Sequence, residues 1–345
     1  MVGALPVRGQ HGRAFPDSGS SRTSDRLRYF VFQKLGCGLG MGIGKMTSTL
    51  EEKVYTDWLP NLSFRDRINL FRQNCKFKWV PFRGYYRFRS YKYMKQINPE
   101  MGLLRFLMNH SMISLDVGAN LGLFTYFLAR YSKHVHAFEP NPLAFDILCS
   151  IADRNVTLHR EALTDRTGEA ELLVPRSPKG WSNNGASLSR IPDGLYGRVR
   201  VAAARIDDLD LCNIGFIKID VEGHELSVLR GAEETLRRNR PNLFVENETT
   251  HAGSGVFTVF ELLSDLDYDG FFLDNGIMTH ISRFSPEEHQ TLRRATPSLR
   301  ESYVKNFIFL PCHSGTPSER RASMTASAAI ATAARLRSGL GVPPS

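Results

Sequence analysis

Apolar residues recur between about residues 97 and 311 in two alternating patterns. Short apolar runs predict strands, and apolar residues at helical spacing predict amphipathic helices. The predicted strands cover residues 112–117, 134–138, 156–162, 169–174, 198–203, 216–220, 242–246, 270–273 and 303–310. The predicted helices cover residues 121–131, 142–154, 225–238 and 256–266. Strands that alternate with helices of this length require crossover connections, so the sequence predicts an α/β fold with a mainly parallel sheet.

These patterns stop at both ends of the chain. Residues 1–45 are rich in Gly, Ser and Arg without a sustained period, which predicts a disordered extension. Residues 312–345 are rich in Ser, Ala and Thr, and a disordered tail is expected there. No stretch approaches the roughly 18 apolar residues of a membrane-spanning helix. The α/β domain is therefore expected at residues 99–311.

Residues 46–98 form a separate segment whose central part is both basic and aromatic. Residues 64–95 contain ten Lys or Arg, ten aromatic residues and one acid, Asp66. Residues 64–74 predict a short helix, and residues 76–88 partly alternate as strands do. Such a surface suits nucleic acid, a phosphorylated or lipid-linked saccharide, or a membrane. The alternative, which we expect for residues 46–98, is that the aromatic residues pack on the α/β domain while the cations stay in water.

Composition narrows the class of protein. Of the 345 residues, 42% are hydrophobic and 23% are charged, which excludes a wholly disordered or fibrous chain. The net charge of +9 favours anionic partners. The five cysteines are dispersed and show no zinc-site spacing. They favour a reducing compartment, and hence the cytoplasm, over a disulfide-bonded secreted domain.

A loop of small residues follows the first predicted strand. The run Asp116-Val117-Gly118-Ala119-Asn120-Leu121-Gly122 lets the backbone turn tightly and approach a ligand closely. At the carboxyl edge of a parallel sheet, such a loop is where cofactors bind. It is not a P-loop, because no Gly-Lys-Ser/Thr follows, and it lacks the third glycine of the dinucleotide fingerprint.

Glu139 ends the next predicted strand, about twenty residues beyond the loop, where an acid can accept hydrogen bonds from both ribose hydroxyls. An acidic ribose anchor without a phosphate cradle favours a nucleoside that lacks pyrophosphate, S-adenosylmethionine. Taken singly, each residue also has a structural interpretation. Gly118 and Gly122 are then turn residues, and Glu139 is an acid at a helix start.

Several longer strings resemble a single family. DVGANLGLFT (116–125), AFEPNP (137–142), IKIDVEGHE (217–225), VLRGA (228–232) and NFIFLP (306–311) occur in this order. Together they resemble the FkbM family of S-adenosylmethionine-dependent methyltransferases, over about residues 100–311. The resemblance implies a Rossmann-like class I methyltransferase fold, with a seven-stranded, mostly parallel sheet, helices on both faces and an antiparallel last hairpin. It also implies O-methylation of hydroxyls on sugars or polyketide-like products.

The resemblance implies site residues as well. The residues expected to hold the methionine part of S-adenosylmethionine are Asp116, Gly118, Asn120 and Gly122. Glu139 would hold the ribose, and Ala162, with Leu163, would lie beside the adenine. Residues 183–187 resemble a loop near the substrate, which makes Asn183 and Ser187 candidates for substrate binding.

Three polar residues, Asp220, Glu222 and His224, follow the predicted strand at 216–220 and are candidates for catalysis. An alcohol needs a general base, and His224 is the first choice because a helix start keeps imidazole neutral. Asp220 could orient that ring or accept the proton, and Glu222 could do either or cap the helix. The alternative is a structural turn around Gly223. No metal is assigned, because the cluster has no distant partner.

Glu246 lies on the same predicted edge and is a candidate for binding the acceptor, or else a solvated loop acid. The sequence therefore predicts an S-adenosylmethionine-dependent O-methyltransferase. Its expected partner is a small-molecule or glycan acceptor (a sugar, glycolipid or polyketide-like molecule), including anionic or lipid-linked ones, with peripheral membrane contact open. The alternatives are a methyltransferase acting on nucleic acid and a non-catalytic binding module. His134, His136 and His280 are expected to be structural.

Overall fold

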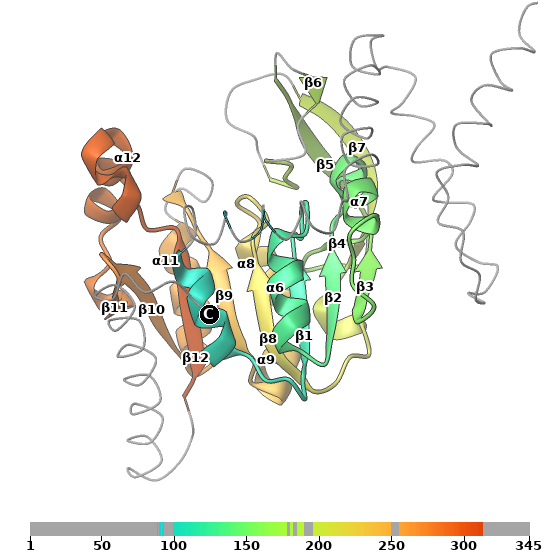
Figure 1. The fold of residues 1–345 in the computed structure, drawn as a ribbon, viewed down its shortest axis with the longest axis horizontal. Coiled ribbons are helices and arrows are strands. Elements are labelled where there is room, and N and C mark those ends of the chain that lie inside the picture. Colours follow the sequence, from blue (N-terminus) through green and yellow to red (C-terminus); the bar gives the residue numbers. More distant parts are fainter. Residues whose placement is uncertain are drawn as a thin grey trace, which may run out of the picture. The chain divides into compact units, whose positions relative to one another are not determined.

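The computed structural model describes residues 88, 90, 92, 99–177, 180–181, 185–189, 196–249 and 255–312 (Figure 1). The extension predicted at 1–45 and the tail predicted after Cys312 lie outside the described residues. So does the helix predicted at 64–74. Positions 88, 90 and 92 are helical, so the strand-like pattern predicted at 76–88 is wrong at its last residue.

An eight-stranded sheet forms the centre of the described part of the chain, in the order β11-β10-β12-β9-β8-β1-β2-β3 (Figure 1). Its strands are β1 Ile113–Val117, β2 His134–Phe138, β3 Val156–His159, β8 Ile214–Ile219, β9 Asn242–Glu246, β10 Tyr268–Asp274, β11 Ile277–His280 and β12 Asn306–Pro311. From β3 to β9 the neighbouring strands are parallel, whereas β12 is antiparallel to β9 and to β10. The predicted α/β class is confirmed, and the carboxyl ends of the parallel strands meet at one edge.

The predicted number of strands, seven, is wrong because β11 adds an antiparallel edge strand to β10. A two-residue turn joins these strands. Asn275 and Gly276 both have positive φ, 48° and 80°. Two positive φ angles give a tight hairpin whose twist matches that of the strands it joins.

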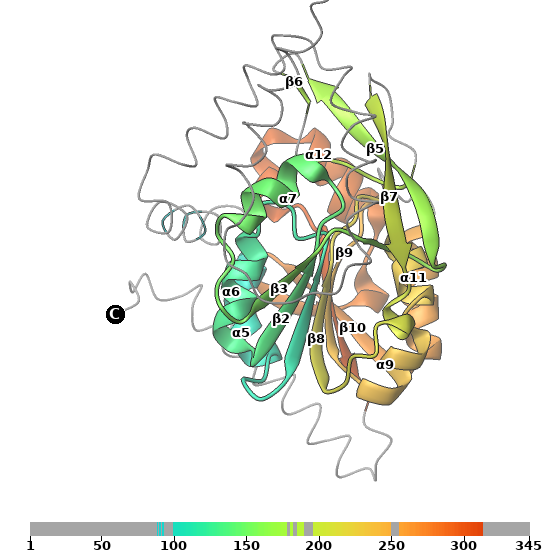
Figure 2. The same cartoon turned by 90° about the vertical axis from the view of Figure 1, so that its right-hand side faces the viewer.

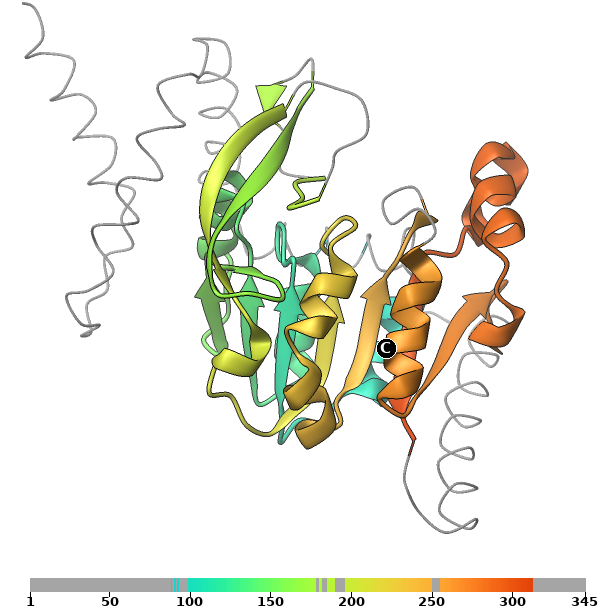
Figure 3. The same cartoon turned by 180° about the vertical axis from the view of Figure 1, so that it is seen from behind.

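Helices cover both faces of the sheet. On one face lie α5 Leu104–Leu107, α6 Leu123–Tyr131 and α7 Pro142–Cys149, and on the other lie α8 Glu225–Arg230, α9 Glu233–Asn239 and α11 Val256–Asp265 (Figures 2 and 3). Shorter helical pieces are η2 Pro99–Leu103, η3 Ile206–Asp208, η5 Ile281–Arg283, the π-helix η6 Glu287–Leu292, α12 Arg293–Ala295 and η7 Pro297–Ser302. None of the helices in the described ranges has the length and apolar character needed to cross a membrane.

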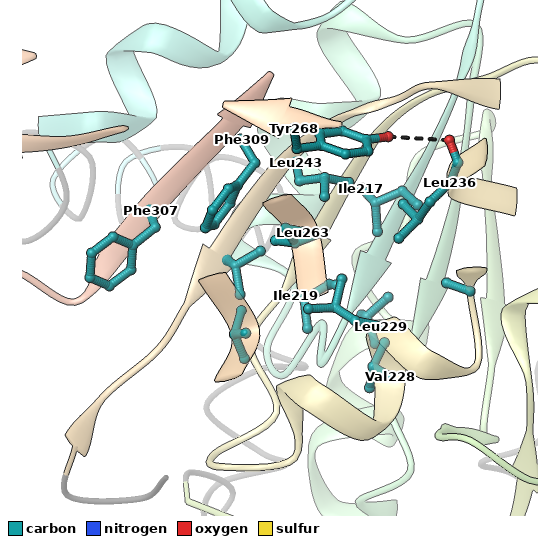
Figure 4. Packing of buried hydrophobic residues seen from close by; sticks show 14 of the residues in the cluster. Ile217, Ile219, Val228, Leu229, Leu236, Leu243, Leu263, Tyr268, Phe307 and Phe309 are labelled. Carbon is teal, nitrogen blue, oxygen red and sulfur yellow. Dashed lines mark hydrogen bonds between the residues drawn. The ribbon is translucent and has the colours of Figure 1, made fainter. Parts of the chain in front are cut away.

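Successive side chains of the parallel strands enter two apolar cores. Ile217 and Ile219 of β8 pack with Leu243 and Phe307 on the face covered by α8, α9 and α11 (Figure 4). Phe216, which directly precedes Ile217 and points to the opposite face, enters the core beneath α5 and α6 instead. Parallel strands buried on both faces appear as apolar runs in the sequence, which is why the sequence located them.

The helix predicted at 225–238 is two helices, because α8 ends at Arg230 and α9 begins at Glu233. Gly231 lies between them, and a Cβ atom there would come within 2.0 Å of the Thr164 carbonyl oxygen. The close approach of a distant loop therefore requires glycine at the break. The apolar periodicity of the sequence continues across this point and does not reveal it.

A second, four-stranded sheet lies above the carboxyl edge of the main sheet, in the order β4-β7-β5-β6 (Figures 1 and 3). Its strands are β4 Ala162–Leu163, β5 Gly168–Ser177, β6 Gly180–Trp181 and β7 Tyr196–Ala204. β5 and β7 confirm the strands predicted at 169–174 and 198–203, and they form an antiparallel hairpin. The strand predicted at 156–162 is divided, because β3 ends at His159 while β4 pairs with β7.

Candidate functional site

A cavity of about 550 Å³ opens at the carboxyl edge of β1, β2, β8 and β9. Most residues predicted for the site line it: Gly118, Asn120, Glu139, Ala162, Ser187, Asp220, Glu222, His224 and Glu246. Asp116 and Gly122 are not among its lining residues. Asn183 lies outside the described residues. The fold thus brings together segments that are up to about 130 residues apart in the sequence.

The loop after β1 is pressed against the loop after β8. Gly118 has φ +75°, and a Cβ atom there would lie 1.9 Å from the Asp220 carbonyl oxygen, so only glycine fits. The amides of Gly118 and Ala119 both donate to the Phe138 carbonyl, at 3.0 and 2.9 Å. Gly122, with φ 75°, starts α6 and acts as a turn residue. The small residues of this loop therefore serve close backbone packing as well as access to the cavity.

Glu139 lies at the end of β2 with its carboxylate held by two backbone amides. Its Oε2 accepts from Asn120 N at 2.6 Å, and its Oε1 accepts from Asn141 N at 2.8 Å. Burial raises the pKa of Glu139 to about 7, although the two hydrogen bonds oppose that rise. A carboxylate oxygen accepts more than one hydrogen bond, so this fixed group at the cavity wall fits ribose hydroxyls.

The apolar wall beside Glu139 fits the remaining part of a nucleoside. Phe138, Ala162 and Leu163 line the cavity next to that carboxylate, and all three are buried. A flat base can be buried against such a surface, whereas the ribose needs the polar group beside it. These residues are compatible with S-adenosylmethionine in the orientation that the sequence predicts.

Asp116 lies beneath the loop rather than at the cavity. Its side chain is fully buried, and its Oδ2 accepts from the Thr125 hydroxyl at 2.6 Å. Its Oδ1 is 3.3 Å from the ammonium of Lys218, a cavity-lining residue that the sequence reasoning missed. The sequence could have indicated Lys218, because a lysine flanked by isoleucines in a buried parallel strand needs an oppositely charged or polar partner.

Glu222 and Asp220 line the part of the cavity formed by the turn after β8, where the sequence predicts the acceptor. Glu222 has a left-handed backbone, with φ 52°, which is unusual for a residue other than glycine. Burial, and then the charges of Asp220 and Glu248, raise the pKa of Glu222 to about 7. Below this turn, Glu225 Oε1 accepts from the amides of Val221 and Gly223, at 3.3 and 3.0 Å. These two hydrogen bonds therefore fix the backbone of the turn that carries Glu222.

His224 has both ring nitrogens engaged. Nε2 lies 2.8 Å from the Thr164 hydroxyl, and Nδ1 lies 3.2 Å from the Ser189 hydroxyl. Burial lowers the pKa of His224, which keeps the ring neutral. Each of these hydroxyls also has an acceptor of its own, because Ser189 donates to the Gly223 carbonyl at 3.1 Å and Thr164 donates to Asp165 Oδ1 at 3.2 Å. To take a proton from an acceptor, a ring nitrogen of His224 would first have to release one of these hydroxyls.

Two further predicted residues of the cavity wall, Ser187 and Glu246, have defined partners. The Ser187 hydroxyl donates to the Glu222 carbonyl at 2.7 Å, so the segment 185–189 is fixed to the turn. Both carboxylate oxygens of Glu246 accept from Lys305 Nζ, each at 2.8 Å. Glu246 is thus held by a specific cation, unlike an ordinary solvated loop acid. Within the described ranges, no three His, Cys, Asp or Glu side chains are grouped as a metal site would require.

Comparison with known proteins identifies the family of the domain. Residues 116–273 match the methyltransferase FkbM domain. The hexuronic acid methyltransferase AglP of Haloferax volcanii is 28% identical over 178 residues, which cover 50% of this chain and 71% of that protein. The 31-O-demethyl-FK506 methyltransferase FkbM of Streptomyces tacrolimicus is 29% identical over 156 residues, which cover 35% of this chain and 60% of that protein.

Among solved structures, methyltransferase FkbM from Methylobacillus flagellatus matches with a TM-score of 0.38 and 18% identity, covering 59% of this chain and 44% of that chain. The matched residues contain the glycine loop, Glu139 and the turn after β8, all of which line the cavity. The resemblance seen in the sequence is therefore confirmed over the matched residues, and the matched domain is a methyltransferase domain. Residues 116–273 of this chain therefore form a methyltransferase domain of the FkbM type.

Proposed function

We propose that this methyltransferase transfers its methyl group to a hydroxyl of a sugar, glycolipid or polyketide-like acceptor. The observation that carries the proposal is the presence in one cavity of two carboxylates whose pKa burial raises, the buried Glu139 at the end of β2 and the half-buried Glu222 after β8. The first suits a ribose and the second suits an acceptor hydroxyl. The relatives AglP and FkbM are named for the methylation of a hexuronic acid and of 31-O-demethyl-FK506, respectively.

The cofactor half of the cavity would be formed by the loop after β1 and the end of β2. Glu139 accepts the ribose hydroxyls, the backbone from Gly118 to Asn120 borders the methionine part, and Ala162 lies beside the adenine. When bound, S-adenosylmethionine supplies a methyl group on a positively charged sulfur. Asp116 and Gly122 support this half from beneath and do not contact the cofactor. The residues chiefly align the reactants and exclude water.

Glu222 is proposed as the general base that accepts the hydroxyl proton of the acceptor. A base works best when its pKa lies near the working pH, and burial places the pKa of Glu222 at about 7. Asp220 is 3.4 Å from the Lys218 ammonium and helps to fix the turn. His224 is assigned to positioning, because its two ring nitrogens are engaged by Thr164 and Ser189.

The acceptor half of the cavity is polar, as a hydroxyl-rich molecule requires. Ser187, Glu246 and Lys305 line it, and Lys92 brings one cation of the basic aromatic segment to the same cavity. This supports a polar acceptor, including an anionic one. Membership of a methyltransferase family favours an enzyme over the non-catalytic alternative. The cytoplasmic location and the methylation of nucleic acid stay predictions from the sequence.

The test combines cofactor binding with methyl transfer. Titration calorimetry with S-adenosylhomocysteine should show binding to the wild-type chain and a loss of about tenfold or more for Glu139→Ala. Glu169→Ala, an exposed acid on β5, is the matched control and should bind as the wild type does. Equal affinity of Glu139→Ala and wild type would remove the ribose role.

The acceptor class is tested with isotope-labelled S-adenosylmethionine and separated pools of cell saccharides, glycolipids, polyketides and nucleic acids. Mass spectrometry should find the label as a methyl ether in one of the first three pools. Label confined to nucleic acid, or to nitrogen or carbon atoms, would overturn the proposed acceptor.

A further inference from the structure

Lys218 is a buried cation at a position where the strand pattern calls for an apolar side chain. It follows Phe216 on the same side of β8, facing the core beneath α6, and only 2% of it is exposed. Its ammonium is 5.2 Å from the centre of the Phe124 ring. Burying an ammonium is costly unless it is paired, so the contacts of Lys218 must offset that cost.

Three oxygens surround the ammonium, and they belong to different parts of the site. The Gly118 carbonyl accepts a hydrogen bond from Lys218 Nζ at 2.7 Å. Asp116 Oδ1 and Asp220 Oδ2 lie at 3.3 and 3.4 Å. Burial alone would lower the pKa of Lys218, but the charges of Asp220, Asp116 and Glu246 raise it above its usual range. The group is therefore a permanent cation with directed contacts.

The two loops that Lys218 joins are already in close backbone contact. The amide of Asp220 donates to the Val117 carbonyl at 3.0 Å. The α-carbon of Gly118 faces the Asp220 carbonyl so closely that no Cβ fits. With the Lys218 ammonium bound to the Gly118 carbonyl and close to Asp220, neither loop can shift alone. A displacement of the loop after β1 must displace the turn that carries Asp220 and Glu222.

We propose that Lys218 is a positioning residue that couples the cofactor loop to the acceptor-side turn. Asp116 balances its charge, the Gly118 carbonyl fixes its direction, and Asp220 is the group that it holds in place. These contacts keep the bound cofactor at a fixed distance from the carboxylates of Asp220 and Glu222. Methyl transfer requires such an alignment of the reactants. The inference rests on the proposed function, which assigns the loop after β1 to the cofactor.

The test measures S-adenosylhomocysteine affinity in a set of variants by titration calorimetry. Asp116→Asn combined with Lys218→Met removes the buried pair together, so that no buried charge stays unpaired. We expect this double variant to bind about tenfold more weakly than wild type. Asp220→Asn should weaken binding severalfold in the wild-type background, and should cause no further loss when added to the double variant. Lys133→Met, which removes an exposed lysine, is the control.

Two results would overturn the coupling. One is a double variant that binds as tightly as wild type. The other is independent losses, in which Asp220→Asn weakens the double variant by the same factor as wild type. Suppose that wild type binds S-adenosylhomocysteine, that Glu139→Ala does not, and that the double variant binds it normally. The positioning role of Lys218 then fails, whereas the proposed cofactor site stands. If wild type itself does not bind, the proposed function fails together with this inference.

A second measurement tests the coupling without the double variant, in case that variant does not fold. Hydrogen–deuterium exchange of the Gly118 and Ala119 amides is compared between wild type and Asp220→Asn, which retains Lys218. Faster exchange of these amides in the variant, with unchanged exchange in β10 and β12, is the expected result. Unchanged exchange at Gly118 and Ala119 would overturn the coupling.

Discussion

At the scale of single residues, Glu222 combines partial burial, a left-handed backbone and a place in the cavity wall. Such a conformation costs on the order of 1 kcal/mol and persists only where the surroundings hold it. Here Glu225 binds two amides of the same turn, and Ser187 binds the Glu222 carbonyl. The strained residue is therefore held at the position where the proposed proton transfer takes place.

Glu222→Gln should lower kcat by about 10²–10⁴-fold and leave S-adenosylhomocysteine affinity unchanged, because the amide cannot accept the proton. A base acts in its ionised form, so the wild-type rate should rise as pH increases through about 7, the pKa of Glu222. That rise should be absent from the variant. Full activity of Glu222→Gln together with loss of activity in His224→Asn would return the role of base to the histidine.

The sequence predicted residues whose role depends on spacing and missed those whose role depends on distant partners. Glu139 was found because it follows the glycine loop at a characteristic distance. The partners of His224 could not be found, since Thr164 and Ser189 reach it from segments far away in the sequence and leave no local pattern. Lys218 could have been found, because a charge within an apolar strand is itself a signal.

At the scale of elements, the break between α8 and α9 is stabilised from a distance. No local side chain caps α9, and the carboxylate of Asp207 accepts from the amides of Thr235 and Glu234 instead, at 2.8 and 3.3 Å. The periodicity of residues 225–238 predicted one helix because a cap supplied by η3 is not visible locally. The Asn275-Gly276 pair, in contrast, is a local hairpin signal from which the eighth strand could have been predicted.

Asp207→Ala should lower the free energy of unfolding by about 1–2 kcal/mol, because two amides at the start of α9 lose their acceptor. Urea denaturation followed by circular dichroism measures this change. Asp265→Ala, at an exposed position in α11, is the control and should change stability by less than about 0.5 kcal/mol. A loss no larger in Asp207→Ala than in the control would contradict the assigned capping role.

At the scale of the whole molecule, three carboxyl groups with a raised pKa make stability depend on pH. Burial raises the pKa of Glu139, Glu222 and Glu225 from 4.5 to about 7 in each case. A carboxyl group with a raised pKa stabilises the folded state fully below its unfolded pKa, and this contribution disappears as pH rises through the folded pKa. These groups therefore cause the ligand-free protein to lose stability between pH about 4.5 and about 7.

Glu225→Gln should reduce that loss, by up to about 3 kcal/mol, because the amide oxygen can still accept from Val221 and Gly223 without carrying a charge. Thermal unfolding at several pH values between 5 and 8 measures it. Glu169→Gln, at an exposed position, should leave the pH dependence unchanged. A Glu225→Gln variant whose melting temperature follows the wild-type curve across this range would show that Glu225 does not carry the effect.

The hairpin of β5 and β7 has a small apolar cluster of its own, formed by Leu172, Val174, Val199 and Val201, with Ala162 and Leu143 packed at its base. The main sheet contributes no strand to this cluster. The part of the hairpin beyond Ala162 and Leu143 can therefore be lengthened, shortened or replaced by the hairpin of a relative. The proposed cofactor half of the cavity should then keep its structure. Engineering a new acceptor preference would best begin in this hairpin, with β1, β2 and β8 left unchanged.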